Sequence, residues 1–556
     1  CILNRRYANS SKAFNVIDPA NAEDWAILVL LCEVFSLLLM MMGDAEFFDQ
    51  AKNPLKLKEV VEMSGVLRDI AFTLFWNDVD LKRVLQGTSI QILYLRNIVT
   101  KLTQQIHGRD SRRPFCPATH WLAPDLDVES FARSVIAEEQ AIEADQPFTR
   151  HHLATVSPRL GVLNNIPFVL PFEDRVEIFR QFVATDRQRS RIDDYFHQPV
   201  ERAKVHRDSV FQDGFEQLNK LGSKLKVKIA ISFIDQFGLA EAGIDGGGVF
   251  KEFLTALAQQ AFDTNYGLFL STPENLLYPN PHAFAIECAD YFTDVYDLFA
   301  FPAQQLAYFE FLGRIIGKAL YEGILVDVAF AGFFLSKWLR KQNYLDDLPS
   351  LDPELYQGLI SLRNYDGNVE DLALDFTVTS SEFGKSDIID LIPNGRNIPV
   401  TNANRIRYIH LMADYRLNTQ IDRQCRAFLR GLTDLVEPKW LRMFNQQELQ
   451  ILLGGASTPI DIEDLRLNTQ LSGYTETDPT IQNLWQIVAA MNNDQRKRFL
   501  KFVTSCSRPP LLGFKELNPH FCIRNAGEDD ERLPTSSTCV NLLKLPNYSK
   551  FETLRK

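Results

Sequence analysis

The sequence lacks an excess of positive charge. Its 556 residues contain 59 lysines and arginines but 71 aspartates and glutamates, which gives a formal net charge of −12 at pH 7. A protein whose main partner is nucleic acid needs a basic surface to neutralise the phosphates. We therefore expect no nucleic-acid partner.

The eight cysteines also lack any pattern typical of metal binding. They are scattered, with no Cys-x-x-Cys pair and no Cys/His cluster at zinc spacing, so we predict no metal site. In a chain of this length the simplest interpretation is free thiols in a reducing compartment, which indicates the cytoplasm, the nucleus or both. We identify no signal peptide. Because the first residue is Cys1 rather than methionine, we expect a piece of a longer protein.

One apolar run, residues 25–42, resembles a membrane span but lacks its flanking features. Glu33 lies near its middle, and acidic residues rather than basic anchors stand on both sides. A span has about 20 apolar residues and basic residues on the cytoplasmic side. We interpret the run as a buried helix of a helical array and expect no membrane partner.

A glycine-rich stretch at residues 243–248 lacks the residues of a nucleotide site. Neither a Gly-Lys-Ser/Thr ending nor a complete Gly-x-Gly-x-x-Gly is present. Glycines before a helix can hold phosphate. Without those endings, the stretch predicts a tight turn that lets the next helix, residues 249–262, pack closely.

The first part of the chain has apolar residues at helical spacing. Residues 1–155 are predicted to form a helical, solenoid-like region, although no repeat of fixed period supports a named repeat family. A scaffold or substrate-binding arm and a purely structural support both fit it. Residues 156–204 are predicted as linker and helices that pack on the domain beginning at residue 205. Within these regions the expected helices cover residues 24–42, 55–76, 81–107, 128–144, 173–184 and 187–212, the last of them broken near Pro199. Residues 145–171 are expected to be an extended linker.

The second part mixes helices with strands, so the fold class is α+β. Strands are expected at 224–233, 375–379 and 388–393. Gly313 and Gly317 lie in a predicted helix at residues 304–323 and allow close helix packing. The composition of residues 454–459 is that of a short flexible linker and separates a last unit of about 95 residues. Further helices are expected at 330–339, 352–364, 401–412, 419–435, 446–453, 480–491 and 493–503.

Cys539 lies between a polar run and a mainly apolar run. Residues 535–538 are four hydroxyl residues after a proline and predict an exposed loop. Residues 540–545 predict a short strand. This places the thiol on a loop tip held by a strand, where a nucleophile could belong. The alternative is an inert thiol, since a single cysteine is a weak signal.

Several motifs, taken in order, resemble the HECT-type ubiquitin ligases from about residue 205 to the end. AGIDGGGVFKEF (242–253) and FLGRIIGKAL (311–320) resemble parts of that family's large lobe, and ELQILLGG (448–455) resembles the stretch before its hinge. LNT and SGY (467–474), FVTSCSRPP (502–510) and LPTSSTCVN (533–541) resemble its small lobe. The resemblance implies an N-terminal all-α helical region followed by a bilobal domain: a large, mostly helical lobe at 205–453 with a subdomain that binds the conjugating enzyme, a hinge at 454–459, and a small α/β lobe at 460–556.

The resemblance also implies a covalent mechanism. Cys539 would accept ubiquitin as a thioester from a ubiquitin-conjugating enzyme and pass it to substrate lysines. Thr538, Leu533 and Pro534 would support the active-site loop. No cofactor is needed at this site, because exchange between thioesters is nearly isoenergetic. The main requirement is proximity, which a hinge containing Gly454, Gly455 and Pro459 would provide.

Other implied partners come from further motif matches. NNIPFVLPF (164–172) is similar to the proteasome-associated subgroup, which implies the proteasome as a partner and a role in protein degradation. By motif, seven positions match the surface that binds the conjugating enzyme, although all could equally be core residues. They are Leu355, Leu359, Leu362, Tyr365, Leu372, Tyr408 and Met412.

Three departures from the family pattern affect the expected chemistry. Ser537 stands where many members have histidine, and the nearest histidine of the small lobe, His520, has no evident role as a base. Val540 replaces a common phenylalanine. The chain stops at Lys556, whereas family members continue into a tail with a phenylalanine that supports transfer. We therefore expect this chain to load ubiquitin more readily than it ligates it.

Two other functions remain possible on the sequence. A cysteine hydrolase acting on ubiquitin would need a positioned histidine and an Asn or Asp. The cysteine motif contains no histidine, which counts against this function. A non-catalytic helical scaffold fits the first 200 or so residues.

Overall fold

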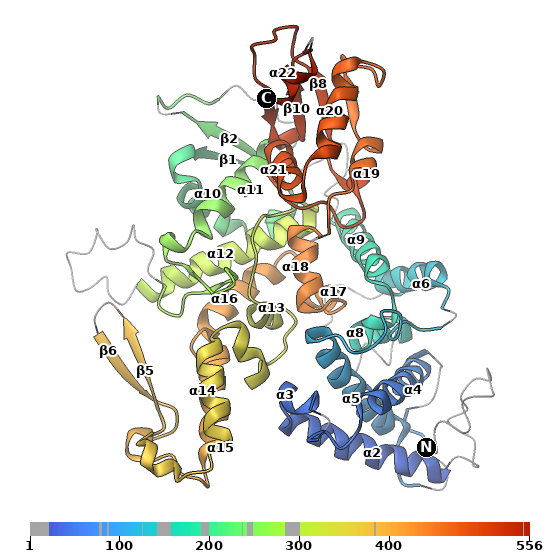
Figure 1. Cartoon of the computed structure of the whole chain (residues 1–556), viewed down its shortest axis with the longest axis vertical. Coiled ribbons are helices and arrows are strands. Elements are labelled where there is room, and N and C mark those ends of the chain that lie inside the picture. Colours follow the sequence, from blue (N-terminus) through green and yellow to red (C-terminus); the bar gives the residue numbers. More distant parts are fainter. Residues whose placement is uncertain are drawn as a thin grey trace. The chain divides into compact units, whose positions relative to one another are not determined.

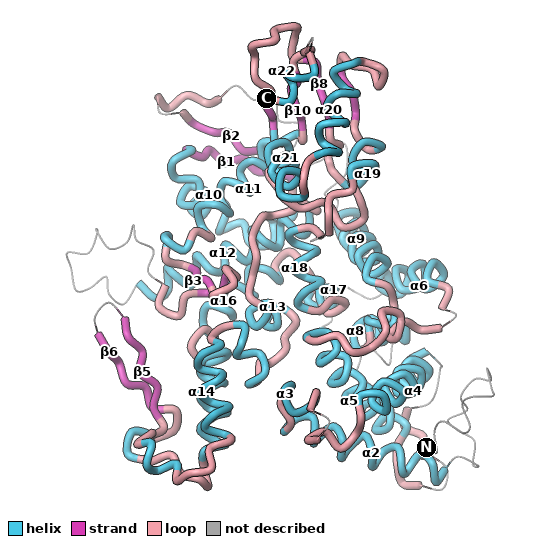
Figure 2. Tube along the Cα trace, in the orientation of Figure 1, coloured by secondary structure: helices cyan, strands magenta, loops and turns pink. Residues whose placement is uncertain are grey.

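The computed structural model describes residues 22–49, 51–76, 81–85, 88–124, 126–141, 157–190, 200–235, 237–241, 248–283, 301–382, 385–456, 458–548 and 550–556. The chain divides into two compact units, residues 1–185 with 439–444, and residues 186–438 with 445–556. The glycine-rich turn predicted at 243–248 lies outside the described residues except for Gly248. Figure 1 shows the order of the elements, and Figure 2 shows that helices dominate the described chain.

Unit 1 is helical throughout its described elements, as the sequence predicts. Helix α5 packs against both α2 and α4, and α8 packs against α4 and α6. No helix in the described ranges is long and apolar enough to cross a membrane. Among the described residues, the α-helices of this unit are α2 (Ala22–Met41), α3 (Asp44–Phe47), α4 (Leu57–Trp76), α5 (Ile92–Arg112), α6 (Val128–Ala141), α8 (Pro158–Asn165), most of α9 (Phe172–Arg189) and most of α17 (Pro438–Leu441).

Helix α2 is buried on one face only, which qualifies the prediction of a buried helix. Trp25, Leu28, Cys32, Phe35 and Leu39 are buried. The other face leaves apolar side chains exposed, at Ile27, Leu30, Val34, Leu37 and Met41.

Two sequence predictions in unit 1 are wrong. The helix expected at 81–107 begins only at Ile92, because Thr88 bonds to the backbone of Leu85 and Ile90 and Val84 bridges to Gln91. Such local side-chain bonds compete with helix formation. The linker expected at 145–171 contains α8 and the 3-10 helix η2 (Pro167–Val169). Pro158 begins α8, where a missing N–H costs nothing, so it starts a helix rather than breaking one.

The short segment 439–444 belongs to unit 1 through buried polar and aromatic contacts. The indole of Trp440 donates to the Glu139 carboxylate at 3.0 Å, and Lys439 lies 2.7 Å from the same oxygen. Arg175 donates to the carbonyl of Met443 at 2.5 Å, and the rings of Phe179 and Phe444 meet edge to face. These contacts desolvate Glu139 while pairing it, which is the condition for burying a charge.

The described part of unit 2 contains helices and four small, separate sheets, which confirms the α+β class. Two are the antiparallel pairs β3–β4 and β5–β6. The other two are the parallel pair β1–β2 and the four-stranded sheet β7-β8-β10-β9. The main elements are β1 (Val200–His206), α10 (Val210–Leu218), β2 (Lys228–Ile234), α11 (Gly248–Ala261), β3 (Phe269–Ser271), β4 (Leu277–Pro279), α12 (Phe301–Glu322), α13 (Gly332–Trp338), α14 (Pro353–Arg363), β5 (Thr377–Glu382), β6 (Lys385–Asp390), α15 (Arg405–Asp414), α16 (Asp422–Thr433), α18 (Gln446–Gly454), α19 (Ile462–Leu467), β7 (Gln470–Ser472), α20 (Pro479–Ala490), α21 (Asn493–Thr504), β8 (Cys522–Asn525), β9 (Thr535–Ser537), β10 (Leu542–Leu545) and α22 (Phe551–Arg555).

The helix predicted at 187–212 is wrong over residues 200–206, which form strand β1. Ala203 and Val205 are buried while their neighbours are more exposed, and Ala203 pairs with Ile231 of β2. This alternation is the strand period of two. Only two of the seven residues of β1 are buried, so the alternation covers too few positions to predict a strand from the sequence.

Helices α12 and α16 meet at glycines, which confirms the close packing expected of Gly313 and Gly317. A Cβ added to Gly313 would lie 1.9 Å from the carbonyl oxygen of Phe428, and one added to Gly431 would lie 1.7 Å from that of Glu310. A Cβ on Gly317 would lie 3.1 Å from the carbonyl oxygen of Leu432. The two backbones are therefore in direct contact, which requires glycine.

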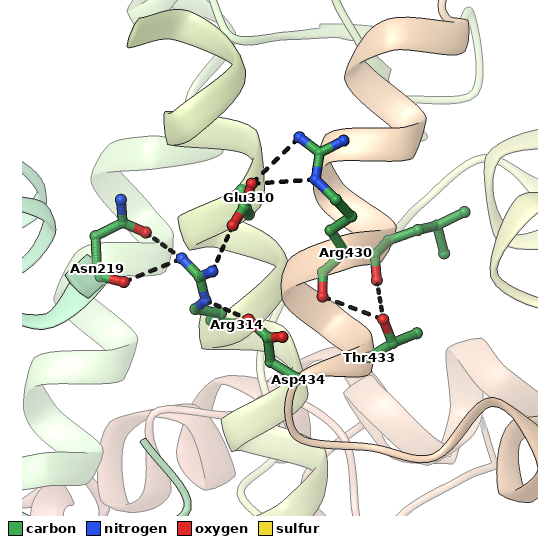
Figure 3. Close-up of polar contacts among 7 residues, drawn as sticks. Asn219, Glu310, Arg314, Arg430, Thr433 and Asp434 are labelled. Carbon is green, nitrogen blue, oxygen red and sulfur yellow. Dashed lines mark hydrogen bonds and ion pairs between the residues drawn. The ribbon is translucent and has the colours of Figure 1, made fainter. Parts of the chain in front are cut away.

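A charged network surrounds this glycine contact. The buried Arg314 donates to Asp434 at 2.7 Å and to the side chain of Asn219 at 2.5 Å, and it also pairs with Glu310 (Figure 3). Arg430 of α16 reaches the second oxygen of Glu310 at 3.2 Å. Because each arm of Arg314 has an oxygen partner, its burial leaves no uncompensated charge.

Candidate active site

The site is built on the sheet of the last 100 residues. Strand β10 runs parallel to β8 and antiparallel to β9, and Leu542 pairs with Ser537. The four residues between these partners include the 3-10 turn η13 (Thr538–Val540). Cys539 is the middle residue of η13, so its backbone lies in the turn between the two strands. Its side chain lies outside the described part of the structure.

The sequence prediction for this stretch is right in outline and wrong at both edges. Thr535–Ser537 form strand β9 instead of an exposed loop, and Val540 belongs to the turn instead of the strand. The backbone of β9 pairs with β10, and such pairing overrides the turn preference of hydroxyl residues. The cysteine turn is therefore held by strands on both sides.

An apolar core supports the turn. Leu543 and Leu545 of β10 pack with Ile523 of β8 and with residues of α19, α20 and α21. The core comprises Ile460, Leu465, Tyr474, Ile481, Leu484, Trp485, Val488, Leu500, Val503, Phe514, Phe521, Ile523, Leu543, Leu545 and Tyr548. Because one side of β10 is fixed in this core, the turn at its start has a fixed place relative to the sheet.

Asn541 ends the turn in a left-handed conformation, with φ 50° and ψ 41°. It is fully buried, and its side-chain amide donates to the carbonyl of Pro519 at 2.5 Å. Its own carbonyl accepts from the backbone N–H of Cys522 at 2.9 Å. Asparagine tolerates this conformation better than other residues with a Cβ. Asn541 could therefore have indicated from the sequence that the turn ends there.

Lys251 of α11 contacts the same asparagine. Its Nζ lies 2.5 Å from Oδ1 of Asn541, which is 290 positions away in the sequence. The contact joins the turn that contains Cys539 to a helix of the preceding part of unit 2, and α11 also packs against η13. Neither residue was among the site residues expected from the sequence.

The cysteines whose side chains are described are poor candidates for a nucleophile. Burial raises the pKa of Cys32, Cys116 and Cys425 to about 12, and it also raises the pKa of Cys506 and Cys522. A thiol with a raised pKa holds little thiolate near neutral pH, and the thiolate is the reactive form. Their chemistry is therefore that of inert core or half-buried residues.

The residues expected around Cys539 differ in exposure. Thr538 and Pro534 are half-buried, and Leu533 is 78% exposed. His520 is exposed and lies in the loop before β8. The roles proposed for Thr538, Leu533 and Pro534 stay predictions.

The expected hinge is packed at its start. Gly454 is buried at the end of α18, and Gly455 has φ 84°. The N–H of Ala456 donates to the carbonyl of Pro509 at 2.9 Å. Residue 457 lies outside the described residues, and Pro459 is exposed. The role of Gly454, Gly455 and Pro459 as a hinge stays a prediction.

The seven positions expected to bind the conjugating enzyme do not form one exposed surface. Four of them are buried around α14 and α15, where they pack as core residues, as the alternative interpretation held. These are Leu359, Leu362, Tyr408 and Met412. Tyr365 is 38% exposed, Leu372 is 41% exposed and Leu355 is half-buried. These last three are the positions that a partner could contact directly.

Comparison with known proteins gives consistent matches. The family model described as HECT-domain (ubiquitin-transferase) matches residues 255–556. A probable E3 ubiquitin protein ligase of Schizosaccharomyces pombe is 44% identical, with 96% of this chain and 51% of the relative covered. The E3 ubiquitin-protein ligase UPL6 of Arabidopsis thaliana is 37% identical (100% and 52%), as is the ubiquitin-protein ligase E3B of Homo sapiens (96% and 49%). The chain spans about half the length of these relatives.

Proposed function

The chain belongs to the HECT-domain family of ubiquitin transferases, and from this premise we propose that it is a ubiquitin-protein ligase that carries ubiquitin on Cys539. The observation that carries the proposal is the place of Cys539 in a short turn between two paired strands, inside the region that matches the family model. A turn held on both sides presents a thiol with little conformational freedom to lose.

The proposed reaction has two steps. In the first, the Cys539 thiolate attacks the carbonyl carbon of the thioester that joins ubiquitin to the conjugating enzyme, and the thiolate of that enzyme leaves. In the second, the neutral amine of a substrate lysine attacks the new thioester, and Cys539 leaves as thiolate while the amine loses a proton to solvent or a base. One thioester replaces another and is then converted to an amide, so no oxidant or nucleotide is consumed here.

We propose that the conjugating enzyme binds near the accessible part of the surface around α14 and α15. Tyr365 and Leu372 are exposed apolar residues there, and exposed apolar anchors are typical of interface centres. Leu372→Ala should weaken binding of the conjugating enzyme measured by titration calorimetry. Leu239→Ala, which truncates an exposed leucine in the loop after β2, is the matched control. Equal affinities for the two variants would place the docking surface elsewhere.

The resemblance of residues 164–172 to the proteasome-associated subgroup supports a role in proteasomal degradation, in the cytoplasm or nucleus. In the structure Asn164, Phe168 and Val169 are buried in unit 1. These three side chains are therefore not accessible to a partner, and any contact with the proteasome would use other residues of that region. Co-sedimentation of the purified chain with purified proteasomes tests this partner, and absence of the chain from the proteasome fraction would count against it.

A single-turnover discharge assay tests the ligase function. The chain is loaded with labelled ubiquitin, loading is stopped, and free lysine is added. A ligase releases ubiquitin faster as lysine increases and forms ubiquitinated lysine. A cysteine hydrolase releases free ubiquitin at a rate independent of lysine, and that result would replace the proposed function.

A further inference from the structure

The contact between Lys251 and Asn541 has the features of a docking contact for the cysteine turn. The ammonium of Lys251 lies 2.5 Å from an amide oxygen, and that amide belongs to the residue two positions after Cys539. Hydrogen bonds from a charged donor are shorter and roughly twice as strong as neutral ones. This bond therefore acts directly on the turn that holds Cys539.

Asn541 transmits this bond to the backbone because both ends of its amide are engaged. Its nitrogen donates to Pro519 and its oxygen accepts from Lys251. The residue is fully buried and its carbonyl accepts from Cys522. Loss of Lys251 leaves the buried amide oxygen without this donor, and an unsatisfied buried polar atom is costly. The turn then loses one of the bonds that fix it.

Besides the packing of α11 against η13, the other polar contacts that the described structure shows between the last 100 residues and the preceding part of unit 2 lie away from the turn. Lys501 pairs with Asp327 at 2.8 Å, but the lysine side chain is 52% exposed, so the pair contributes little. Ala456 and Cys506 contact Pro509 and Gly454 beside the predicted hinge. The bond from Lys251 is different because it reaches the turn itself.

We propose that Lys251 is a positioning residue that docks the Cys539 turn onto α11 for the transfer of ubiquitin to lysine. The proposal rests on the proposed ligase function. The docked arrangement serves the second step, the transfer to lysine, because α14 and α15 lie well apart from β8 and β10 (Figure 1). The conjugating enzyme is expected to bind near α14 and α15. Loading requires the turn to reach that enzyme, whereas transfer uses the turn held against α11.

Three variants test the proposal. Lys251→Met removes the donor and keeps the apolar stem, Lys251→Arg restores a charged donor, and Lys224→Met removes an exposed lysine as a control. The loss of a charge-assisted bond predicts a roughly tenfold slower discharge to lysine in Lys251→Met, with loading changed less than about twofold because loading does not use the docked turn. Lys251→Arg should recover most of the discharge rate.

Hydrogen exchange gives a readout that does not depend on ubiquitin. In Lys251→Met the amides of residues 538–545 and of Cys522 should exchange faster than in Lys224→Met, because the turn is less firmly held. The proposal is overturned if exchange is the same in the two variants, or if loading and discharge fall equally. A wild-type chain that fails to load ubiquitin would refute the ligase function, while the exchange comparison would still decide the docking role of Lys251.

Discussion

The glycine contact between α12 and α16 should make unit 2 intolerant of one methyl group at Gly431. A Cβ there would lie 1.7 Å from the carbonyl oxygen of Glu310 and 2.9 Å from the backbone nitrogen of Arg314. Both neighbours are backbone atoms of α12, so no side chain can rotate away. Ordinary contact begins near 3.4 Å, and the helices would have to separate by about 1.7 Å to restore it.

The size of the effect follows from this overlap. Overpacking a well-packed core typically costs about 1–3 kcal/mol, and a clash with backbone belongs at the upper end. Alanine recovers about 1 kcal/mol through its helix propensity. The free energy of unfolding of Gly431→Ala should therefore fall by roughly 2 kcal/mol. Separation of the helices would also weaken the bonds from Arg314 and Arg430 to Glu310.

Gly358 in α14 is the matched control. A Cβ there would meet nothing within 4 Å, so Gly358→Ala should raise the free energy of unfolding by about 0.5–1 kcal/mol. Urea unfolding of both variants, followed by circular dichroism, measures the two changes. Hydrogen exchange of α12 and α16 shows whether the loss of stability in Gly431→Ala arises at the contact between these helices. Equal stabilities, or faster exchange in α14 only, would refute the close helix contact.

Two further predictions concern pH and helix capping. Burial and the nearby Arg68 lower the pKa of His120 in the folded protein. Below about pH 6.5 the unfolded state therefore binds more protons than the folded state. The free energy of unfolding consequently falls as the pH decreases below that value. The melting temperature of the wild type and of a His410→Gln control should decrease between pH 7 and pH 5, and that of His120→Gln should decrease less. The same decrease in all three proteins would contradict the role of His120. The side-chain oxygen of Asn445 caps α18 by accepting from the backbone N–H of Glu448 at 2.9 Å. Asn445→Ala should therefore lower the free energy of unfolding in urea by about 1 kcal/mol, and Asn445→Ser should lower it much less. An alanine variant of unchanged stability would rule out the cap.

The sequence predicted elements well where the pattern was long and local. Helix α12 has apolar residues at helical spacing over many turns, and its glycines indicated close packing before the partner helix was known. Strand β1 was missed because its seven residues include only two buried ones, at Ala203 and Val205. Pro158 was misread because proline begins helices as well as ending segments.

The site was predicted in part for the same reason. Cys539 stands in a short motif, so its place near a strand could be inferred from neighbouring residues. The contact of Lys251 with Asn541 joins positions 290 apart, and no local pattern encodes such a pair. The sequence also could not predict which residues of the expected docking surface are exposed. Leu359 is buried and Leu372 is exposed although both are leucines, because only the packing around them differs.

The most direct test of the central claim is a ubiquitin-loading reaction analysed without reductant. With activating enzyme, conjugating enzyme and ATP, the wild-type chain should form an adduct that reductant removes, and peptide mapping should place it on Cys539. Cys522→Ala, which truncates the neighbouring half-buried thiol of β8, should still form the adduct, and Cys539→Ala should form none. An undiminished adduct in Cys539→Ala would contradict the proposed role of this cysteine.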